Sequence, residues 1–266
     1  MTLVTGRLAP TPSGHLHLGN ALAFGAAWLS VRGAGGRLLL RIEDLDRGRA
    51  RDDVAAGQRE DLLWLGIDWD EEVAPQSRRQ YRLDGLPVYR CDCSRAVRLA
   101  RACRCRDRAA GRGAWRYRTP PGAVEFVDRA LGPHRILPED DPIVMRDTGE
   151  AAYPLAIVVD DARDGVTEVV RGGDLIDATA TQIRLYQELG LPPPTYLHVP
   201  LLLGPDGKKL SKSHGSTEIR ALRTAGHKAD DIWVTLLPLL GLPPGPLHRA
   251  RLDPAAILRG PRIVTV

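Results

Sequence analysis

The chain has 266 residues, of which 43% are hydrophobic and 26% are charged, with 37 Lys and Arg against 33 Asp and Glu. This composition is ordinary for a globular protein and excludes a mostly disordered chain, a collagen-like fibre and a disulfide-rich toxin. No apolar stretch approaches the roughly 20 residues that a membrane-spanning helix needs. Residues 1–5 show no basic region followed by an apolar core. We therefore expect no membrane span and no secretion signal, and we expect a cytoplasmic protein.

The first part of the chain predicts alternating strands and helices. A short strand at residues 6–9 ends at Pro10, and apolar residues at helical spacing predict a helix from Leu18. A continuous apolar strand at 38–42 and a helix over about 52–65 follow. This strand–helix–strand order is typical of a right-handed crossover unit in an α/β protein with a parallel sheet.

The pattern breaks between about residues 81 and 150 and then resumes. Apolar runs at 156–159 and 166–170 predict strands, and a helix is expected from about 176 to 189. Residues 196–199 predict a further strand, and residues 231–240 show a helical pattern. We therefore expect a Rossmann-like parallel sheet that is split by an inserted α+β segment and followed by a small helical C-terminal region.

A block of positive charge lies at this break. Residues 78–118 hold thirteen arginines and no lysine against three aspartates, so the rest of the chain is net acidic. Such a block favours a polyanion such as RNA, whose phosphates the arginines would contact. A solvated or disordered arginine run explains the charge equally well. In the RNA interpretation Trp115 and Tyr117 stack on bases, and otherwise they pack in the core or on the surface.

The turn between the first strand and the first helix is a candidate phosphate site. It reads PTPSGHLHLGN over residues 10–20. Open α/β sheets bind ligands beyond the carboxyl ends of their strands, and a helix N-terminus favours phosphate. His15 and His17 can donate to phosphate oxygens as charge develops, although a histidine taken alone more often serves packing or turn structure.

A lysine-rich loop is the second candidate. It reads KKLSKS over residues 208–213 and follows GPDG, and it suits a mobile clamp on a polyphosphate. Alone it also fits a solvated turn. The sequences HLGN at 17–20 and KLSKS at 209–213, in this order, resemble the paired signatures of class I aminoacyl-tRNA synthetases.

Three further stretches narrow this resemblance to the glutamyl group of that class. They read RIEDLD at 41–46, VVDD at 158–161 and GVTEVVRGGD at 165–174. Because no helical anticodon-binding domain is expected after the lysine-rich loop, the chain is similar to the glutamyl-Q tRNA(Asp) synthetase family. The resemblance implies a ligase that activates L-glutamate with ATP and attaches it to the queuosine base in the anticodon of tRNA(Asp).

The resemblance also implies the domains and the site residues. Residues 1–80 and 152–204 would form the two halves of the catalytic domain, 81–151 the RNA-facing insertion, and 205–266 the KLSKS loop and helical region. The catalytic pair would be His17 and Lys212. The glutamate site would comprise Arg7, Leu8, Ala9, Pro10, Thr11, Glu43, Tyr153 and Arg171. The ATP site would comprise Pro10, His17, Gly19, Asn20, Lys209, Ser211 and Lys212.

Each of these roles has a physical rationale. Arg7 and Arg171 would face carboxylates, to which a guanidinium can bind through two hydrogen bonds. Glu43 would accept the substrate ammonium, although outside this context it fits a strand-end ion pair with Arg41 or Arg47. The implied chemistry is attack of the glutamate α-carboxylate on the α-phosphorus of ATP, with Mg²⁺ held chiefly by the phosphates.

All four cysteines lie in the insertion, as the pairs Cys91 with Cys93 and Cys103 with Cys105. In an intracellular chain this spacing favours structural zinc over disulfides, and free thiols are the alternative. The resembled family binds zinc with a CxC pair, a tyrosine and a later cysteine. Arg101 stands in place of that tyrosine and cannot ligate zinc, so Cys103 would substitute, or part of the metal affinity would be lost.

Three other functions are compatible with parts of this pattern. One is a discrete glutamyl-tRNA synthetase catalytic domain that charges a tRNA 3′ end. Another is a nucleotidylyltransferase with a similar histidine turn, which would lack the glutamate-binding set. A catalytically inactive RNA-binding paralogue is the non-enzymatic alternative. In each case we expect a monomer.

Overall fold

The computed structural model describes residues 3–93, 103–107, 111–138, 140–204, 218–257, 259–260 and 262–263. Four residues singled out above lie outside these ranges: Arg101, Lys209, Ser211 and Lys212. Among the helices that are described, none is long and apolar enough to cross a bilayer.

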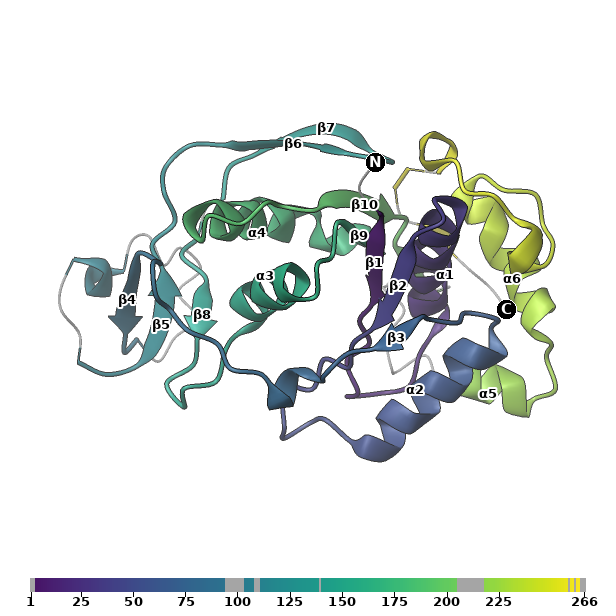
Figure 1. Ribbon diagram of the computed structural model, residues 1–266, viewed down its shortest axis with the longest axis horizontal. Helices are drawn as coiled ribbons and strands as arrows, with labels where there is room; N and C mark the ends of the chain where they lie inside the picture. The colour runs from purple at the N-terminus through teal and green to yellow at the C-terminus, as the bar shows by residue number, and fades with distance from the viewer. Residues whose placement is uncertain are drawn as a thin grey trace.

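The first part of the chain forms parallel strands joined by helices, as predicted (Figure 1). Strand β1 (Thr5–Leu8) pairs in parallel with β2 (Arg37–Leu40), which pairs in parallel with β3 (Glu71–Glu72). Helix α1 (Leu18–Gly33) connects β1 to β2, and α2 (Asp52–Trp64) connects β2 to β3. The connection from β1 to α1 is the turn that carries the histidines.

A second group of strands comes from later in the chain. Strand β9 (Glu168–Gly172) pairs in parallel with β10 (Thr195–Val199), and α4 (Ile176–Glu188) connects them. These elements confirm the strands and the helix predicted there. Strand β6 (Val124–Asp128) lies parallel to β10 and carries the antiparallel strand β7 (Gly132–Ile136). The segment between residues 81 and 151 therefore contributes a hairpin to this sheet.

The two groups of strands meet where β1 lies beside β9. The backbone N–H of Thr167 donates to the carbonyl of Thr5 at 2.8 Å. The N–H of Thr5 in turn donates to the Thr167 hydroxyl at 2.9 Å. Strand alternation then places Leu38 in the cluster packed against α1 and Leu39 in the cluster packed against α4. Helices thus cover both faces at this junction, which accounts for the continuous apolar run in β2.

The apolar run at 156–159 was predicted as a strand, and that prediction is wrong. These residues lie within helix α3 (Tyr153–Arg163), which has a proline in its first turn. A short apolar run does not distinguish a buried strand from a buried helix by periodicity alone, whereas proline suits the start of a helix. The helix buries Leu155 and Val158 against the insertion.

The insertion has its own antiparallel sheet, in the order β4 (Val88–Cys91), β5 (Ala114–Tyr117) and β8 (Ile143–Met145). Figure 1 shows this sheet at the end of the molecule opposite α1 and α2. Tyr117 is fully buried there, so it packs in the core rather than stacking on a base. The partly exposed ring of Trp115 lies 4.7 Å below the Arg90 guanidinium.

The C-terminal region packs on the same core as α1. The ring of Trp233 lies where a Cβ on Gly25 would collide with it, and its indole N–H donates to the carbonyl of Leu65 at 2.8 Å. The helical pattern predicted at 231–240 is observed as a helix followed by a 3₁₀ turn. The elements of this region are β11 (Leu202–Leu203), α5 (Ile219–Thr224), α6 (Ala229–Leu236), the 3₁₀ turn Leu237–Leu240 and β12 (Arg262–Ile263).

Candidate active site

A pocket of about 420 Å³ opens beyond the carboxyl ends of β1, β9 and β10, at the N-terminus of α1. The structure brings together most of the predicted site residues that it describes. Those that line the pocket are Arg7, Ala9, Thr11, His17, Gly19, Asn20, Glu43, Tyr153 and Arg171. Residues more than 160 positions apart in the sequence therefore share one cavity.

Leu8 and Pro10 do not line the pocket. The side chain of Leu8 belongs to the core, and Pro10 is buried. Their backbone carbonyls accept hydrogen bonds from the N–H groups of Arg41 and Glu43, at 2.9 and 3.0 Å. These two residues therefore support the site through their main-chain atoms. Their neighbours Arg7, Ala9 and Thr11 are the residues of this stretch that line the pocket.

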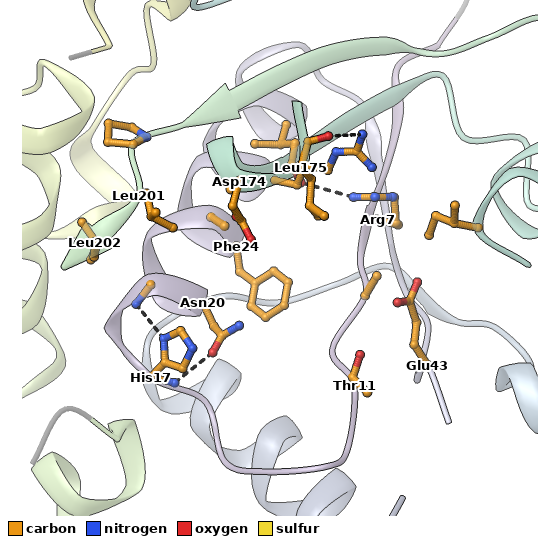
Figure 2. Close-up of a pocket in the computed structure, with 18 of the residues that line it drawn as sticks. Arg7, Thr11, His17, Asn20, Phe24, Glu43, Asp174, Leu175, Leu201 and Leu202 are labelled. Carbon is orange, nitrogen blue, oxygen red and sulfur yellow. Dashed lines mark hydrogen bonds between the residues drawn. The ribbon is translucent and has the colours of Figure 1, made fainter. Parts of the chain in front are cut away.

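The pocket has two chemically different ends (Figure 2). Arg7, Thr11 and Glu43 lie toward one side, and His17 and Asn20 lie toward the other, with Phe24 between them. One end thus combines a cation with an anion, and the other is formed by the start of a helix. A charged amino acid suits the first end, and a phosphate suits the second.

His17 is the N-cap of α1 and also lines the pocket. Its Nδ1 accepts from the N–H of Gly19 at 3.1 Å, and the Asn20 side chain accepts from the N–H of His17 at 3.0 Å. Because Nδ1 accepts in this bond, the proton of a neutral imidazole is on Nε2. His17 therefore has the structural role in the turn that we considered as an alternative. The same hydrogen bond orients its ring in the end of the pocket that is formed by the start of α1.

Gln58 on α2 supports this turn, although sequence reasoning did not select it. Its amide group donates to the carbonyls of Thr11 and Gly14, at 3.0 and 2.7 Å. A glutamine in an amphipathic helix carries no signal of such a role, because the partners are backbone groups 44 or more positions away. His15, the other histidine of the turn, does not line the pocket.

Arg7 reaches the pocket from a buried network of charges. Its Nε donates to Asp161 at 3.3 Å, and its Nη1 donates to the carbonyl of Val170 at 3.2 Å. Asp161 also accepts from Arg41 at 2.6 Å, and Arg41 reaches Glu43 at 3.2 Å. The ion pair between Glu43 and Arg41 that we considered from sequence is therefore present in the site itself.

The net pKa shifts of the two buried carboxyls in this network, Glu43 and Asp161, have opposite directions. Burial raises the pKa of the Glu43 carboxyl, and the attraction of Arg41 and Arg7 offsets this only in part. Burial acts in the same direction on Asp161, but Arg41 and Arg7 outweigh it and hold the pKa of that carboxyl below its ordinary value. The arginines thus favour the anionic form of Asp161, whereas the carboxylate of Glu43 would be stabilised by an additional cation.

Arg171 projects from β9 into the same pocket and is almost fully buried. Its guanidinium donates to His198, Gln182 and Thr179 at 2.7 to 3.1 Å and to the carbonyl of Leu175 at 3.3 Å. The Tyr196 ring lies 5.3 Å from it. Side chains from α4 and β10 therefore fix its orientation, and none of them was identified from the sequence.

The rest of the pocket wall is mostly apolar and was also missed. The additional lining residues are Ala23, Phe24, Ile157, Val170, Gly172, Asp174, Leu175, Pro200, Leu201 and Leu202. Except for Ile157 on α3 and Val170 within β9, these residues lie at or directly after the ends of β9 and β10, or more than one turn into α1. That position is a signal that could have found them, because ligands of α/β sheets bind there.

The lysine-rich loop is bounded by described residues that lie beside this pocket. Before the loop, Leu202 lines the pocket. After it, Glu218 forms a β-bridge with His17, and the N–H of Ile219 donates to the carbonyl of Leu16 at 2.8 Å. The segment between Leu202 and Glu218 thus joins a residue that lines the pocket to one that is bridged to the pocket-lining His17.

The four cysteines converge in the insertion. Their sulfur atoms all lie within 4.8 Å of one another, with Cys93 at 3.3 Å from Cys103 and 3.5 Å from Cys105. Cys91 ends β4 and is 3.7 Å from Cys103. A tetrahedral zinc ion with Zn–S bonds of about 2.3 Å requires sulfur separations of roughly 3.8 Å. This set therefore fits such an ion, and it is a possible metal site.

The arginine block is only partly available to a partner. The side chain of Arg79 is only 5% exposed and pairs with Asp160 and Asp164. Arg116 is buried and donates to the carbonyl of Asp141 at 2.7 Å. The interpretation of the block as phosphate-contacting arginines therefore does not hold for these two, because each has an internal partner. Others whose side chains are described remain exposed, namely Arg78, Arg82 and Arg112.

The sequence matches known proteins over nearly its whole length. A family described as tRNA synthetases class I (E and Q), catalytic domain, matches residues 3–89 and 96–249. A protein of Nitratidesulfovibrio vulgaris named glutamyl-Q tRNA(Asp) synthetase is 43% identical over 96% of this chain and 92% of its own length. The chain belongs to the glutamyl-Q tRNA(Asp) synthetase family. A second member of that family, from Symbiobacterium thermophilum, is 40% identical over 95% of this chain and 92% of its own length.

Full-length glutamate ligases match as well, but over part of their length. The glutamate–tRNA ligase 2 of Halorhodospira halophila is 39% identical over 85% of this chain, which spans 55% of that protein. Among solved structures, glutamate-tRNA synthetase from Elizabethkingia anophelis superposes with a TM-score of 0.81 at 21% identity, over 99% of this chain and 68% of that one. That likeness shows an α/β fold similar to the catalytic domain of the synthetase.

Gly19→Ala should disturb the phosphate end without unfolding the chain. A Cβ on Gly19 would lie 2.9 Å from Cε1 and 3.0 Å from Nδ1 of His17, so the ring must shift. We expect glutamate-dependent ATP–pyrophosphate exchange to fall about ten- to a hundredfold, since misplacement of this size has such effects. The matched control is Gly33→Ala at the other end of α1, where a Cβ meets nothing within 4 Å. Equal rates for both variants would contradict the role of His17.

Glutamate binding should weaken as the pH falls. The raised pKa of Glu43 means that its carboxyl takes up a proton at a higher pH than an ordinary glutamate does, and an ammonium requires the carboxylate. Affinity measured by calorimetry should therefore rise with pH and level off above that pKa, with a decline approaching about tenfold per pH unit below it. Glu43→Gln should bind weakly at every pH and show no such slope. A wild-type affinity that increases toward low pH would contradict this assignment.

Proposed function

We propose that the chain activates L-glutamate with ATP and transfers the glutamyl group to the queuosine base in the anticodon of tRNA(Asp). The observation that carries this proposal is the pocket with Arg7, Arg171 and Glu43 near the capped N-terminus of α1. Relatives that share more than nine-tenths of their length with this chain are named glutamyl-Q tRNA(Asp) synthetase. The same pocket in a full-length ligase context would charge a tRNA 3′ end, which is the competing function.

Glutamate is held between opposite charges. Arg7 and Arg171 bind its carboxylates, Glu43 accepts from its ammonium, and Tyr153 completes the wall. Two cations against one anion suit a substrate with two carboxylates and one ammonium. Leu8 and Pro10 contribute through their backbone, and Ala9 and Thr11 line the approach.

ATP lies at the other end, with its phosphates at the N-terminus of α1. Gly19 and Asn20 shape that end, and the Nε2–H of His17 donates to a phosphate oxygen. The other proposed phosphate partners are Lys209, Ser211 and Lys212, which belong to the segment between the described residues Leu202 and Glu218. Mg²⁺ bound to the phosphates supplies additional charge neutralisation.

The reaction needs alignment and charge stabilisation rather than a protein nucleophile. The α-carboxylate of glutamate attacks the α-phosphorus of ATP, the bond to the bridging oxygen breaks, and pyrophosphate leaves with the electron pair. His17 and Lys212 stabilise the charge that accumulates on the phosphate oxygens. In the second step a hydroxyl of the queuosine cyclopentene ring attacks the glutamyl carbonyl and releases AMP.

The architecture and setting are part of this proposal. The strands on either side of β1 and β9 form one Rossmann-like sheet split by the insertion. Residues 1–80 and 152–204 are its two halves, 81–151 is the RNA-facing insertion, and 205–266 is the KLSKS loop with the helical region. We place the protein in the cytoplasm as a monomer. Exposed arginines of the insertion contact RNA phosphates, which makes the affinity salt-dependent.

We also propose that Cys91, Cys93, Cys103 and Cys105 hold a structural zinc ion. Their sulfur spacing supports this assignment, since all four can reach one centre. In this set Cys103 occupies the place of the tyrosine that the family pattern has, because Arg101 cannot be a ligand. When bound, the ion links β4 to the segment around Cys105 and thereby stabilises the insertion.

The reaction is tested by ATP–pyrophosphate exchange with each of the twenty amino acids, with and without tRNA. We expect exchange with glutamate alone, and a loss of orders of magnitude in Lys212→Ala, which removes a phosphate partner. Lys228→Ala is the matched control, since Lys228 is exposed and is the chain's only lysine outside residues 208–212. Exchange that Lys212→Ala leaves unchanged, or that needs a different amino acid, would contradict the proposal.

The acceptor is tested separately with labelled glutamate and two forms of tRNA(Asp), one with queuosine and one with guanosine at that position. Nuclease digestion then locates the label. Label on the queuosine nucleoside, absent from the guanosine form, supports the proposed function. Label on the 3′-terminal adenosine identifies the competing function instead.

Zinc is tested by metal analysis of protein purified from zinc-replete medium. We expect about one zinc ion per chain, and a much lower affinity toward a competing chelator in Cys103→Ala, which removes one of four ligands. Glu125→Ala on the exposed β6–β7 hairpin is the control. Full zinc affinity in Cys103→Ala would exclude Cys103 as a ligand, and a metal-free wild type would refute the site.

A further inference from the structure

A buried histidine and a buried aspartate lie behind the Arg171 guanidinium. His198 on β10 is completely buried, and its Nε2 accepts from the Nε of Arg171 at 3.1 Å. Its Nδ1 is 2.7 Å from Oδ2 of Asp128, the last residue of β6. Asp128, His198 and Arg171 thus form a chain that runs from the interior of the sheet to the pocket.

The hydrogen bonds determine which protonation state the imidazole has. Nε–H of Arg171 can only donate, so Nε2 of His198 must present a lone pair. The single proton of the ring is therefore on Nδ1, where the Asp128 carboxylate accepts it. A proton on Nε2 would point at the guanidinium N–H and break the contact with Arg171.

The surroundings favour this neutral form. The groups that face the imidazole are Asp128 on β6, Arg171 on β9, Tyr196 stacked on the same strand, His134 on β7 and Thr179 on α4. Burial lowers the pKa of His198, and Arg171 lowers it further, although the hydrogen bond to Asp128 acts in the opposite direction. Burial tends to raise the pKa of Asp128, but the hydrogen bonds from His198 and from backbone N–H groups lower it overall. The aspartate is thus an anion beside a neutral ring.

Asp128 is itself held rigidly. Its Oδ1 accepts from the backbone N–H groups of Ala130 and Leu131, each at 2.9 Å, and its Oδ2 accepts from the N–H of His198 at 3.1 Å. Three backbone bonds therefore fix the carboxylate independently of the imidazole. An arginine that is oriented before its ligand arrives loses less entropy when it binds, so such a support raises affinity.

We propose that Asp128 and His198 are positioning residues for glutamate: the carboxylate fixes the Nδ1–H tautomer of the imidazole, and the imidazole aims the Arg171 guanidinium at the substrate. This inference rests on the proposed function, because it assigns the substrate of Arg171. Thr179, Gln182 and the carbonyl of Leu175 accept from the two terminal nitrogens of Arg171. The pair Asp128 and His198, called the relay below, therefore determines the orientation of the guanidinium at Nε.

The test compares His198→Leu with His198→Gln in glutamate-dependent ATP–pyrophosphate exchange. Leucine fills the space but removes the acceptor, whereas glutamine keeps a carbonyl oxygen near the position of Nε2. We expect His198→Leu to raise the KM for glutamate about ten- to a hundredfold and to leave the KM for ATP unchanged, since a hydrogen bond to a charged group is lost. We expect His198→Gln to recover most of the affinity. His248→Gln, at an exposed histidine, is the control.

A second measurement does not depend on His198→Leu being stable. Imidazole nitrogen shifts of ¹⁵N-histidine protein, assigned by comparison with His198→Gln, report the tautomer directly. We expect a protonated Nδ1 and an unprotonated Nε2 for His198 throughout the range from about pH 6 to pH 8. A proton on Nε2, or a charged ring, overturns the relay even if His198→Leu fails to fold.

The outcomes separate the two proposals. A wild type without glutamate-dependent exchange contradicts the proposed function. An active wild type whose glutamate KM does not change in His198→Leu contradicts the relay alone. Equal increases in the KM for glutamate and for ATP indicate a general packing defect and also overturn it.

Discussion

The burial of opposite charges at the base of the pocket is the constraint on which the rest of the site depends. Arg41 is completely buried, and Asp161 binds both Arg41 and Arg7 from another part of the chain, 120 and 154 residues later. Breaking a buried pair by removing one partner typically costs about 3–5 kcal/mol, because the remaining charge is left uncompensated. The strands before the insertion and the helix after it therefore cannot pack without bringing Arg7 and Glu43 into place.

Several residues serve structure and chemistry with the same atoms. His17 caps α1 through Nδ1 and thereby directs its Nε2 proton. Glu43 pairs with Arg41 and still lines the pocket, where its raised pKa reflects a carboxyl that a bound ammonium would stabilise. The structural and functional interpretations of such residues are compatible, because a group positioned by a hydrogen bond on one side presents a defined face on the other. Arg171 is positioned in the same way, by hydrogen bonds to side chains of α4 and β10, and it also lines the pocket.

In the insertion, the number of arginines in the sequence does not equal the positive charge that a partner can reach. Arg79 and Arg116 belong to internal ion-pair and hydrogen-bond networks, so the net charge of the segment overstates what a nucleic acid can reach. The four cysteines are brought together by the fold, since β4 and the segment around Cys105 place their sulfur atoms within 4.8 Å of one another, which makes a possible metal site. Tyr117 is part of the core that attaches the insertion to α3.

The sequence by itself determined the parts of the fold and of the site that are encoded locally. The strand before Pro10, the helix from Leu18, the histidine turn and the cysteine pairs could be predicted because period, breakers and motif spacing lie within a few residues of one another. The family resemblance pointed to Arg7, Glu43, Tyr153 and Arg171. The run at 156–159 was misassigned because its apolar pattern fits either kind of buried element.

Only the tertiary structure decided which partners these residues have. Gln58, Asp128, Asp161 and His198 act through hydrogen bonds to groups between 27 and 154 positions away, and no local pattern specifies such distances. The pKa directions of Glu43 and His198 likewise follow from burial and from charges on other elements. The physical reason is the same in each case: hydrogen bonding and desolvation depend on proximity in space, and proximity is created by the packing of α1, α3 and α4 around the sheet.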